Sequence, residues 1–410
     1  MIMKQWISVI LLVLCGLFGR GQSMAQDDFN DLSPEDKALL GKAVQAVDDG
    51  LSEVVVSDFD CLAKKYPDNY IVQYERLYNL YQLGRYDEII KKRKFLLKHK
   101  FSNERTYQLI GNSYDLSGNR KEAAKVYLEG LKRFPASGAL YLELGNLSLM
   151  DSDYQKALEY YNKGIVAQPD FASNYYRAAR LYLSSDNGKV WGLVYAESAI
   201  LLAPSNESRH EDMAAMMIDC LKRSITINLG DSTKLSVKLV PDRGITIDKE
   251  SGKVYLAFPG IYEGAMSKPL MKLLAGKIPL VFDIPQLIDI RRGAVESYFS
   301  VTDNIYGNSM YLLEFQKKVI EAGHWDAYNY FLFMPCYPDE FETWYASHRA
   351  DLEAFIDWFN NAPYRLGDGR SVDPIQIFNS YRPIDLIESF KIQAGLLAGE
   401  KDSGADKEVS

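Results

Sequence analysis

The sequence predicts a mainly α-helical protein: a solenoid of helical hairpins, then a small antiparallel β-meander and a helical C-terminal domain. Three observations support this. Apolar residues recur at intervals of three and four through most of the chain, a 34-residue pattern runs from residue 36 to residue 206, and strict alternation follows residue 226. The 410 residues are 47% hydrophobic, and this composition suits two or three domains with cores of their own.

The charge balance excludes one class of partner. The chain has 47 Lys and Arg against 55 Asp and Glu, a formal net charge of −8. A protein that wraps nucleic acid needs an excess of positive charge facing the phosphates. We therefore expect no nucleic-acid partner.

Residues 1–25 have the pattern of a cleavable export signal. Lys4 precedes an apolar stretch from Trp6 to Phe18, and Ser23-Met24-Ala25 then places small residues where a signal peptidase reads them. At ~1.5 Å per residue, that stretch is shorter than the ~30 Å hydrocarbon core of a bilayer. Cleavage would leave a periplasmic or cell-envelope protein that starts with a short leader, residues 26–35.

Association with a membrane is expected in two cases only. One is that the signal stays uncleaved, and the other is that Cys15 carries a lipid. Leu14 precedes this cysteine, where a lipoprotein signal has a small residue, so the sequence favours simple cleavage.

The 34-residue pattern is clearest in residues 104–137 and 138–171. Each copy places a glycine in a first helix, an alanine and a glycine in a second helix, and a proline after it. Small residues let two antiparallel helices approach closely, large ones fill the remaining space, and proline ends the second helix. The positions are Tyr107, Ile110, Gly111, Tyr114, Gly118, Ala123, Tyr127, Gly130 and Pro135 in one copy, and Tyr141, Leu144, Gly145, Tyr154, Ala157, Tyr161, Gly164 and Pro169 in the next.

This combination of positions resembles the tetratricopeptide repeat. Weaker copies cover residues 36–69, 70–103 and 172–206, so about five hairpins are expected, with the helix from Asp212 to Ser224 as a cap. The solenoid would then occupy residues 36–225. The resemblance implies a concave groove, lined by the first helix of each hairpin, that binds a partner's peptide or helix.

The register of the repeats assigns seven side chains to this groove. They are Tyr78, Asn112, Asp115, Leu142, Asn146, Tyr176 and Arg180. Two alternatives stay open: each asparagine can serve only to hydrogen-bond neighbouring helices, and the first tyrosine can belong to the core. Members of the family that capture a C-terminal carboxylate use a clamp of basic residues and asparagine. Gln108, Glu143 and Ser173 stand at three places of that clamp, which argues against such a ligand.

Residues 226–264 predict a three-stranded antiparallel meander. Leu235, Val237 and Leu239 alternate with polar residues, and two further alternating segments, 245–247 and 254–258, follow turn-forming residues. This unit is too small to be stable alone, so we expect it to pack against the helices that follow.

Residues 265–397 return to helical spacing and predict a separate helical domain. Its strongest segments run from Tyr311 to Ala322, from Trp325 to Met334 and from Asp339 to Asn360. Residues 398–410 are small, polar and charged, and we expect a solvated tail there.

The sequence contains no common catalytic signature. The four histidines are spread along the chain, and no zinc-protease, serine-hydrolase or nucleotide-binding motif occurs after the signal. We expect no catalytic residue, no cofactor and no metal site. The favoured hypothesis is a non-catalytic scaffold of the bacterial cell envelope that binds another envelope protein.

Two rival hypotheses remain. One is an envelope hydrolase with its active site in residues 226–400, built on Asp283 and Asp289 or on His324. The other is a glycan-binding protein, which would need Trp325 or Trp344 exposed in a cleft so that a flat apolar ring can stack on a sugar.

Overall fold

The computed structural model is mainly helical, as the sequence predicts. It describes residues 26–186, 188–240, 245–247, 254–256, 258–302, 310–367, 370 and 372, so the predicted signal and tail lie outside the described residues. The chain divides into two compact units, the first ending at Asn174 and the second beginning at Tyr175. In the described part of the chain, no helix is both long and apolar enough to cross a membrane.

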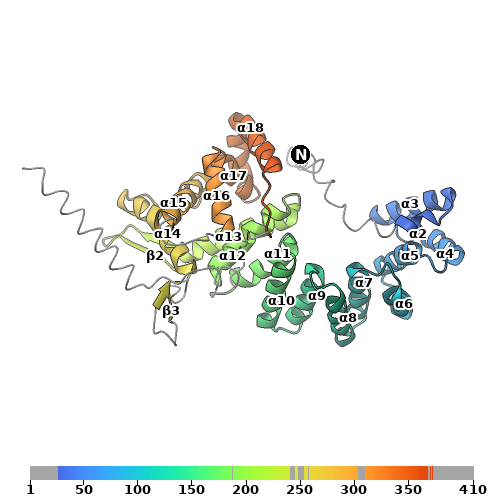
Figure 1. The fold of residues 1–410 in the computed structure, drawn as a ribbon. Coiled ribbons are helices and arrows are strands. Elements are labelled where there is room, and N and C mark those ends of the chain that lie inside the picture. The colour runs from blue at the N-terminus through green and yellow to red at the C-terminus, as the bar shows by residue number, and fades with distance from the viewer. Residues whose placement is uncertain are drawn as a thin grey trace, which may run out of the picture. The chain divides into compact units, whose positions relative to one another are not determined.

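The first unit is a series of helical hairpins that follow the predicted repeat (Figure 1). The hairpins are α3 (Pro34–Asp48) with α4 (Val56–Lys65), α5 (Tyr70–Gln82) with α6 (Tyr86–Lys98), α7 (Glu104–Leu116) with α8 (Arg120–Arg133), and α9 (Gly138–Met150) with α10 (Tyr154–Ala167). The first helices contact one another in succession, α3 with α5, α5 with α7 and α7 with α9. They therefore form one continuous layer, and the predicted solenoid is confirmed.

Polar side chains cap the first turns of these helices. The capping residues are Ser33, Asn69, Asn103, Asn119, Ser137 and Asp153. Each accepts a hydrogen bond from a backbone amide of the first turn, which has no partner within the helix. The sequence thus specifies where most of these helices begin.

A residue with a left-handed backbone ends the first helix of each hairpin or follows it. Gly50, Gly84 and Gly118 have φ angles of 79°, 72° and 81°. They are spaced 34 residues apart, and the next position in the series is Ser152, with a φ of 61°. Glycine adopts this conformation without a steric cost, whereas the Cβ of serine crowds the following carbonyl.

The predicted leader is folded onto the first unit. It contains α2 (Gln26–Asn30), in which Asp28 is buried. The backbone carbonyl of Asp28 accepts a hydrogen bond from Asn69 Nδ2 at 2.7 Å, and its carboxylate accepts one from the Tyr70 amide at 2.5 Å. These bonds attach α2 to the start of α5.

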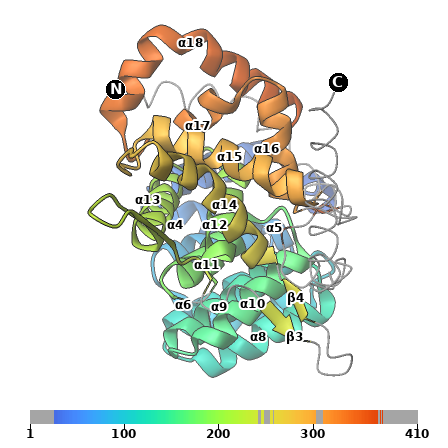
Figure 2. The same cartoon turned by 90° about the vertical axis from the view of Figure 1, so that its left-hand side faces the viewer.

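The second unit contains the last predicted repeat and the C-terminal helices. Its helices are α11 (Ala172–Leu183), which carries the division between the units, α12 (Lys189–Leu202), α13 (Glu207–Ser224), α14 (Phe258–Ala275), α15 (Ile284–Thr302), α16 (Tyr311–Glu321), α17 (Trp325–Phe333) and α18 (Pro338–Asn361). α14 contacts α12 and lies beside α15 (Figure 2), and α17 contacts α13, α15 and α18. Because apolar residues occur all around α12, it needs this cover from several neighbours.

The predicted antiparallel strands are present, but they pair differently from a single meander. β1 (Ile225–Asn228) pairs with β2 (Lys234–Val237), and β3 (Ile245–Ile247) pairs with β4 (Val254–Leu256). Among the described residues these are two separate two-stranded sheets. The partner of β2 is β1, which continues directly from α13 and which the alternation did not mark as a strand. Phe258, expected at the end of a strand, instead begins α14.

Candidate functional site

The first helices of the first unit carry tyrosine and polar side chains on one face. We call these residues the first-helix face: Asp48 of α3; Tyr74, Glu75, Tyr78 and Tyr81 of α5; Arg105, Gln108, Asn112 and Asp115 of α7; and Leu142, Glu143 and Asn146 of α9. Within each helix they recur at three- and four-residue spacing, which places them on one side of it. None of them is fully buried. Five of the seven predicted groove residues belong to this face.

Asn112 and Asn146 each have an internal hydrogen-bond partner. A Cβ added to Gly111 would lie 2.1 Å from the ring of Tyr127, and the hydroxyl of that tyrosine donates to Asn112 Oδ1. The equivalent residues of the next repeat are Gly145, Tyr161 and Asn146. There the Cβ distance is 2.3 Å and the hydroxyl lies 3.0 Å from the amide oxygen. Each glycine–asparagine pair thus forms a seat for a tyrosine of the second helix, with space for its ring and an acceptor for its hydroxyl.

A second set of hydrogen bonds joins α7 to α9. Gln108 Nε2 donates to Glu143 Oε1 at 2.8 Å, and Asn146 Nδ2 donates to Glu143 Oε2 at 3.1 Å. Both oxygens of this carboxylate are therefore bonded within the protein. Two of the three residues that depart from the carboxylate clamp, Gln108 and Glu143, thus form a bridge between neighbouring repeats.

The remaining predicted residues of this face differ in how firmly they are held. Tyr78 stacks on Tyr81, with ring centroids 6.4 Å apart, and packs against both core clusters of the first unit. Asp115 lies 3.6 Å from Arg120 in a long ion pair. Leu142 is partly buried. The tyrosine therefore serves the core and the face together.

Glu75 differs from Asp115 and Glu143 of the same face because it has no partner among the described residues. In the described part of the chain it forms no hydrogen bond and no ion pair, although its side chain is largely enclosed by the helices around it. Burial raises the pKa of its carboxyl to about 7, Asp48 adds to the rise, and Arg105 opposes it. A carboxylate that loses water without gaining a donor favours its neutral form. The first-helix face thus holds a poorly solvated acid that a positive charge would stabilise.

Tyr176 and Arg180, the other two predicted groove residues, lie in the second unit. The Tyr176 hydroxyl donates to Asp212 Oδ2 of α13 at 2.8 Å, and Arg180 forms an ion pair with the same oxygen at 2.5 Å. The guanidinium of Arg209 lies 5.1 Å from the centroid of the Tyr176 ring. These side chains fasten α11 to α13, the helix predicted to cap the repeats.

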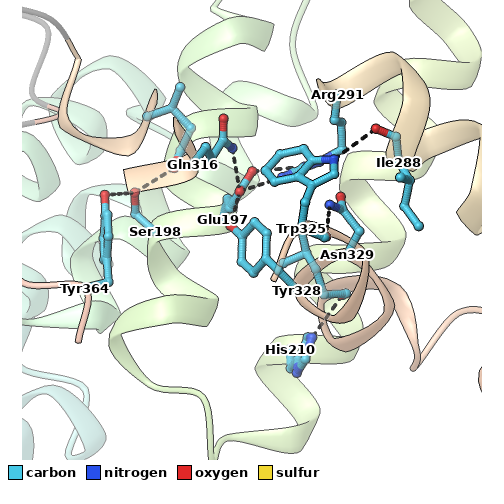
Figure 3. A network of polar contacts seen from close by, with 12 residues as sticks. Glu197, Ser198, His210, Ile288, Arg291, Gln316, Trp325, Tyr328, Asn329 and Tyr364 are labelled. Atoms are coloured by element: carbon cyan, nitrogen blue, oxygen red, sulfur yellow. Dashed lines mark hydrogen bonds and ion pairs between the residues drawn. The ribbon is translucent and has the colours of Figure 1, made fainter. Parts of the chain in front are cut away.

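A buried polar network joins the last repeat to the C-terminal helices (Figure 3). At its centre is Glu197 of α12, which accepts two hydrogen bonds from Arg291 of α15, at 3.0 and 2.6 Å, and one from Gln316 of α16 at 2.6 Å. The hydroxyl of Tyr328, on α17, donates to the same carboxylate. Burial works to lower the pKa of Arg291, but Glu197 outweighs it and the net shift is upward. Four helices therefore meet at one neutralised pair of charges.

The same region contains the residues of the two rival hypotheses. Trp325 is 1% exposed, and its indole nitrogen donates to the Ile288 carbonyl at 3.1 Å. Trp344 is partly buried and stacks on Tyr330 with ring centroids 4.2 Å apart. Neither tryptophan offers the exposed face that a glycan-binding site in a cleft requires.

Two of the three candidate catalytic residues, Asp283 and His324, have structural partners, and Asp289 is exposed. Asp283 Oδ1 accepts a hydrogen bond from the Gln286 amide at 2.9 Å at the start of α15. The His324 ring packs near Trp358, with centroids 5.6 Å apart. Among the described residues, no group of three or more His, Cys, Asp or Glu side chains is placed to hold a metal ion.

Sequence reasoning missed both Glu75 and Glu197. The first is one acid among the tyrosines of α5, and nothing near it in sequence indicates burial. The second has a clearer signal, because a single acid in an otherwise apolar helix must be neutralised by a partner. The partners themselves come from far along the chain and could not be named.

The hairpin series defines the class of this protein: a helical-repeat protein, whose stacked first helices form an extended surface. The tetratricopeptide repeat family model matches residues 109–170, which span most of α7 to α10, and the resemblance seen in the sequence is confirmed there. No curated protein matches the chain.

Several solved structures are similar to parts of the chain. TTC0263, a thermophilic tetratricopeptide repeat protein of Thermus thermophilus, is 18% identical with a TM-score of 0.38, over 45% of this chain and 99% of that one. MamA is 15% identical with a TM-score of 0.33, over 40% and 95%. A human IFIT1 dimer with PPP-AAAA is 12% identical with a TM-score of 0.32, over 74% and 68%. All three TM-scores are below 0.5.

Proposed function

We propose that the protein is a non-catalytic scaffold of the bacterial cell envelope whose first-helix face binds a segment of another envelope protein. Tetratricopeptide repeats are protein-interaction scaffolds as a class. The finer parts of the proposal, the binding face and the compartment, have separate support.

The observation that carries the binding face is the unpartnered carboxylate of Glu75. Its raised pKa of about 7 means that the folded protein holds this group in an unfavourable environment when it is ionised. A lysine or arginine of a partner segment would supply the missing donor and form a charge-assisted hydrogen bond. Asp48 increases the attraction for such a cation, and Arg105 opposes it.

Tyrosines on both sides of Glu75 suit the same partner. Tyr74, Tyr78 and Tyr81 are all partly exposed on α5. A tyrosine provides a large contact area with few rotatable bonds, and its ring attracts a nearby cation. The partner segment favoured by this face therefore has a basic residue next to apolar ones, in an extended or helical form.

Site-specific photo-crosslinking in intact cells tests the binding face. The photoreactive amino acid p-benzoylphenylalanine would replace Tyr78 or Leu142 on the first-helix face, and Leu128, an exposed residue of α8, as the matched control. We expect the first two positions to crosslink to one and the same protein and the control position not to. Equal crosslinking at all three positions would remove the first-helix face from consideration.

A charge-neutral variant then tests the role of Glu75. Glu75→Gln should lower crosslinking from position 78 by roughly tenfold, because it removes one desolvated charge pair. Glu159→Gln, on the exposed side of α10, changes the net charge equally and should have no effect.

Support for export comes from residues 1–25 alone, with Lys4, the apolar stretch and the Ser23-Met24-Ala25 site. N-terminal sequencing of the protein isolated from a periplasmic extract should start at Gln26. Recovery of a chain that starts at Met1 would contradict a cleaved signal.

A further inference from the structure

One helix of the first unit carries a dense group of cations although the whole chain is acidic. We call it the α6 cation cluster: Lys91, Lys92, Arg93, Lys94, Lys98 and Lys100. Arg93 is partly buried and the five lysines are exposed. In the described residues, none of the six is within ion-pair distance of an acid.

Three lysines of the cluster lie on the outward side of α6, and Lys100 follows its last residue, Lys98. Ile89 and Leu96 are fully buried and mark the core side of this helix. Lys91, Lys94 and Lys98 follow at three- and four-residue spacing on the opposite side. The nearest acids, Asp87 and Glu88, are confined to the first turn, and Glu88 is already bound by Arg85 and Arg76.

The stability of α6 does not account for these charges. The helix dipole favours cations in the last turn, which explains Lys98 alone within the helix. Lys91, Lys92 and Lys94 lie one to two turns earlier, and like charges three or four residues apart destabilise a helix slightly. Arg133 of α8 adds a further cation at the end of α6, where it donates to the Leu97 carbonyl at 3.4 Å. These charges slightly destabilise α6, so helix stability does not explain why they are concentrated here.

We propose that the α6 cation cluster binds the anionic headgroups of a phospholipid membrane. Four to eight lysines and arginines on one helix match the pattern of surfaces that bind acidic lipids. A close-packed protein partner is the less favoured occupant, because protein interfaces are depleted in lysine and built around apolar anchors. Phe95 and Leu97, the apolar residues among these lysines, are partly buried in the core of the first unit instead.

This attachment is independent of the first-helix face and of a lipid on Cys15. Long, flexible lysines reach headgroups without a fixed geometry, so the attachment is electrostatic and reversible. Each lysine near an anionic surface strengthens binding by roughly fivefold, and the effect falls off within a Debye length of about 8 Å at physiological salt. The affinity of the cluster for vesicles should therefore fall steeply as lysines are removed and as the ionic strength rises.

Vesicle co-sedimentation with the chain from residue 26 to residue 410 tests the proposal. The vesicles contain phosphatidylcholine alone, or phosphatidylcholine with about a third of phosphatidylglycerol. We expect binding to the second kind only, and its loss at high salt. The triple variant Lys91→Glu, Lys94→Glu, Lys98→Glu should bind at least about 100-fold more weakly. The neutral triple variant with glutamine at these positions should be intermediate.

A matched control variant distinguishes the effect of the cluster from the effect of the net charge of the protein. Lys121→Glu, Lys156→Glu, Lys163→Glu changes the net charge equally at exposed lysines of α8 and α10, and it should retain most of the binding. Equal loss in both triple variants, or no binding by the unmodified chain, would overturn the proposal. Binding of an oligoglutamate peptide without any binding of the acidic vesicles would also overturn it, in favour of an acidic protein partner. Circular dichroism of each variant confirms that the fold is unchanged.

Discussion

Glu75 of α5 in the first unit and Glu197 of α12 in the second unit are both acids on helices, and their environments are opposite. Glu197 is 3% exposed and accepts hydrogen bonds from Arg291, Gln316 and Tyr328. Glu75 is partly exposed and has no partner in the described chain. A buried charge is tolerated when it is paired and fully hydrogen-bonded. The comparison distinguishes an acid that serves the fold from one that is available to a partner.

The difference follows from what covers each hairpin. α12 is surrounded by α13, α14 and the helices of the C-terminal region, so an acid on it meets their side chains. α5 contacts the first helices α3 and α7 and the second helices α4 and α6, and the face that these leave holds tyrosines and Glu75. The C-terminal helices thus do for the last repeat what a partner segment is proposed to do for the earlier ones.

The largest effect is expected from breaking the Glu197 network, which tests whether this network stabilises the second unit. Arg291→Leu leaves a buried carboxylate without its main partner and should lower the free energy of unfolding of the second unit by about 3–5 kcal/mol. Arg292→Leu, at the neighbouring position, breaks a pair with the exposed Asp326 and should cost less than about 1 kcal/mol. Tryptophan fluorescence during urea unfolding is the measurement, because the four tryptophans after the predicted signal, Trp191, Trp325, Trp344 and Trp358, all lie in the second unit.

The double variant Glu197→Leu, Arg291→Leu sharpens this test. Removing both charges leaves no orphaned ion, so it should recover much of the stability lost in Arg291→Leu. A double variant as unstable as the single one would show that packing around Arg291, and not its charge, holds the helices together.

The second prediction concerns the tyrosine seats of the first unit. Gly111→Ala places a Cβ 2.1 Å from the Tyr127 ring, and this overlap should cost about 2–3 kcal/mol. Gly41→Ala is the control, because a Cβ at that position of α3 meets nothing within 4 Å. It should stabilise α3 by about 0.5–1 kcal/mol, since alanine has the higher helix propensity. Urea unfolding followed by circular dichroism measures both, and equal effects would contradict the role of the seat.

The seats also show why so much of the first unit was predictable. Gly111, Ala123 and Gly130 have their contacts within one hairpin or with the next, so the spacing of small and large residues specifies them. The left-handed glycines recur with the same period. A sequence pattern is sufficient to predict the fold where each contact is either local or repeated with a fixed period.

The second unit was less predictable for the opposite reason. Arg291, Gln316 and Tyr328 lie 94, 119 and 131 residues from Glu197 in sequence. No periodicity relates these positions, so only the fold brings them together. The pairing of β1 with β2 was missed because β1 follows α13 without a turn-forming residue between them.

The third prediction concerns pH and the free carboxyl of Glu75. Its pKa of about 7 in the folded state is above the ordinary value of 4.5, so the folded state holds the proton more tightly than the unfolded state. Stability from this group is present below pH 4.5 and is lost as the pH rises through 7. Glu75→Gln should therefore stabilise the first unit by about 2 kcal/mol at about pH 8 and have little effect at about pH 4.

Hydrogen exchange of peptides from α5 and α7 measures this difference, with the variant and the unmodified chain compared at each pH. Glu143→Gln provides the contrast on the same face. It replaces one of the two oxygens that accept from Gln108 and Asn146 with an NH2 group, so it should destabilise the protein at about pH 8. A Glu75→Gln variant that is destabilised under the same alkaline conditions would mean that this carboxylate has a partner in the folded protein.

The smallest effect is expected from substitutions in the turn that links the two helices of each hairpin. Ser152 occupies the position at which three earlier hairpins have glycine, and its φ of 61° lies in the left-handed region. Ser152→Gly removes the clash of the serine Cβ, which costs roughly 1–2 kcal/mol, but it also makes the unfolded chain more flexible. The net stabilisation should be about 0.5–1 kcal/mol. Gly118→Ala makes the reverse change one repeat earlier and should destabilise by a similar amount. In urea unfolding followed by circular dichroism, the midpoint should be higher for Ser152→Gly and lower for Gly118→Ala than for the unmodified protein. Shifts in the same direction would mean that the fourth hairpin, despite its 34-residue register, uses a turn that differs from the others.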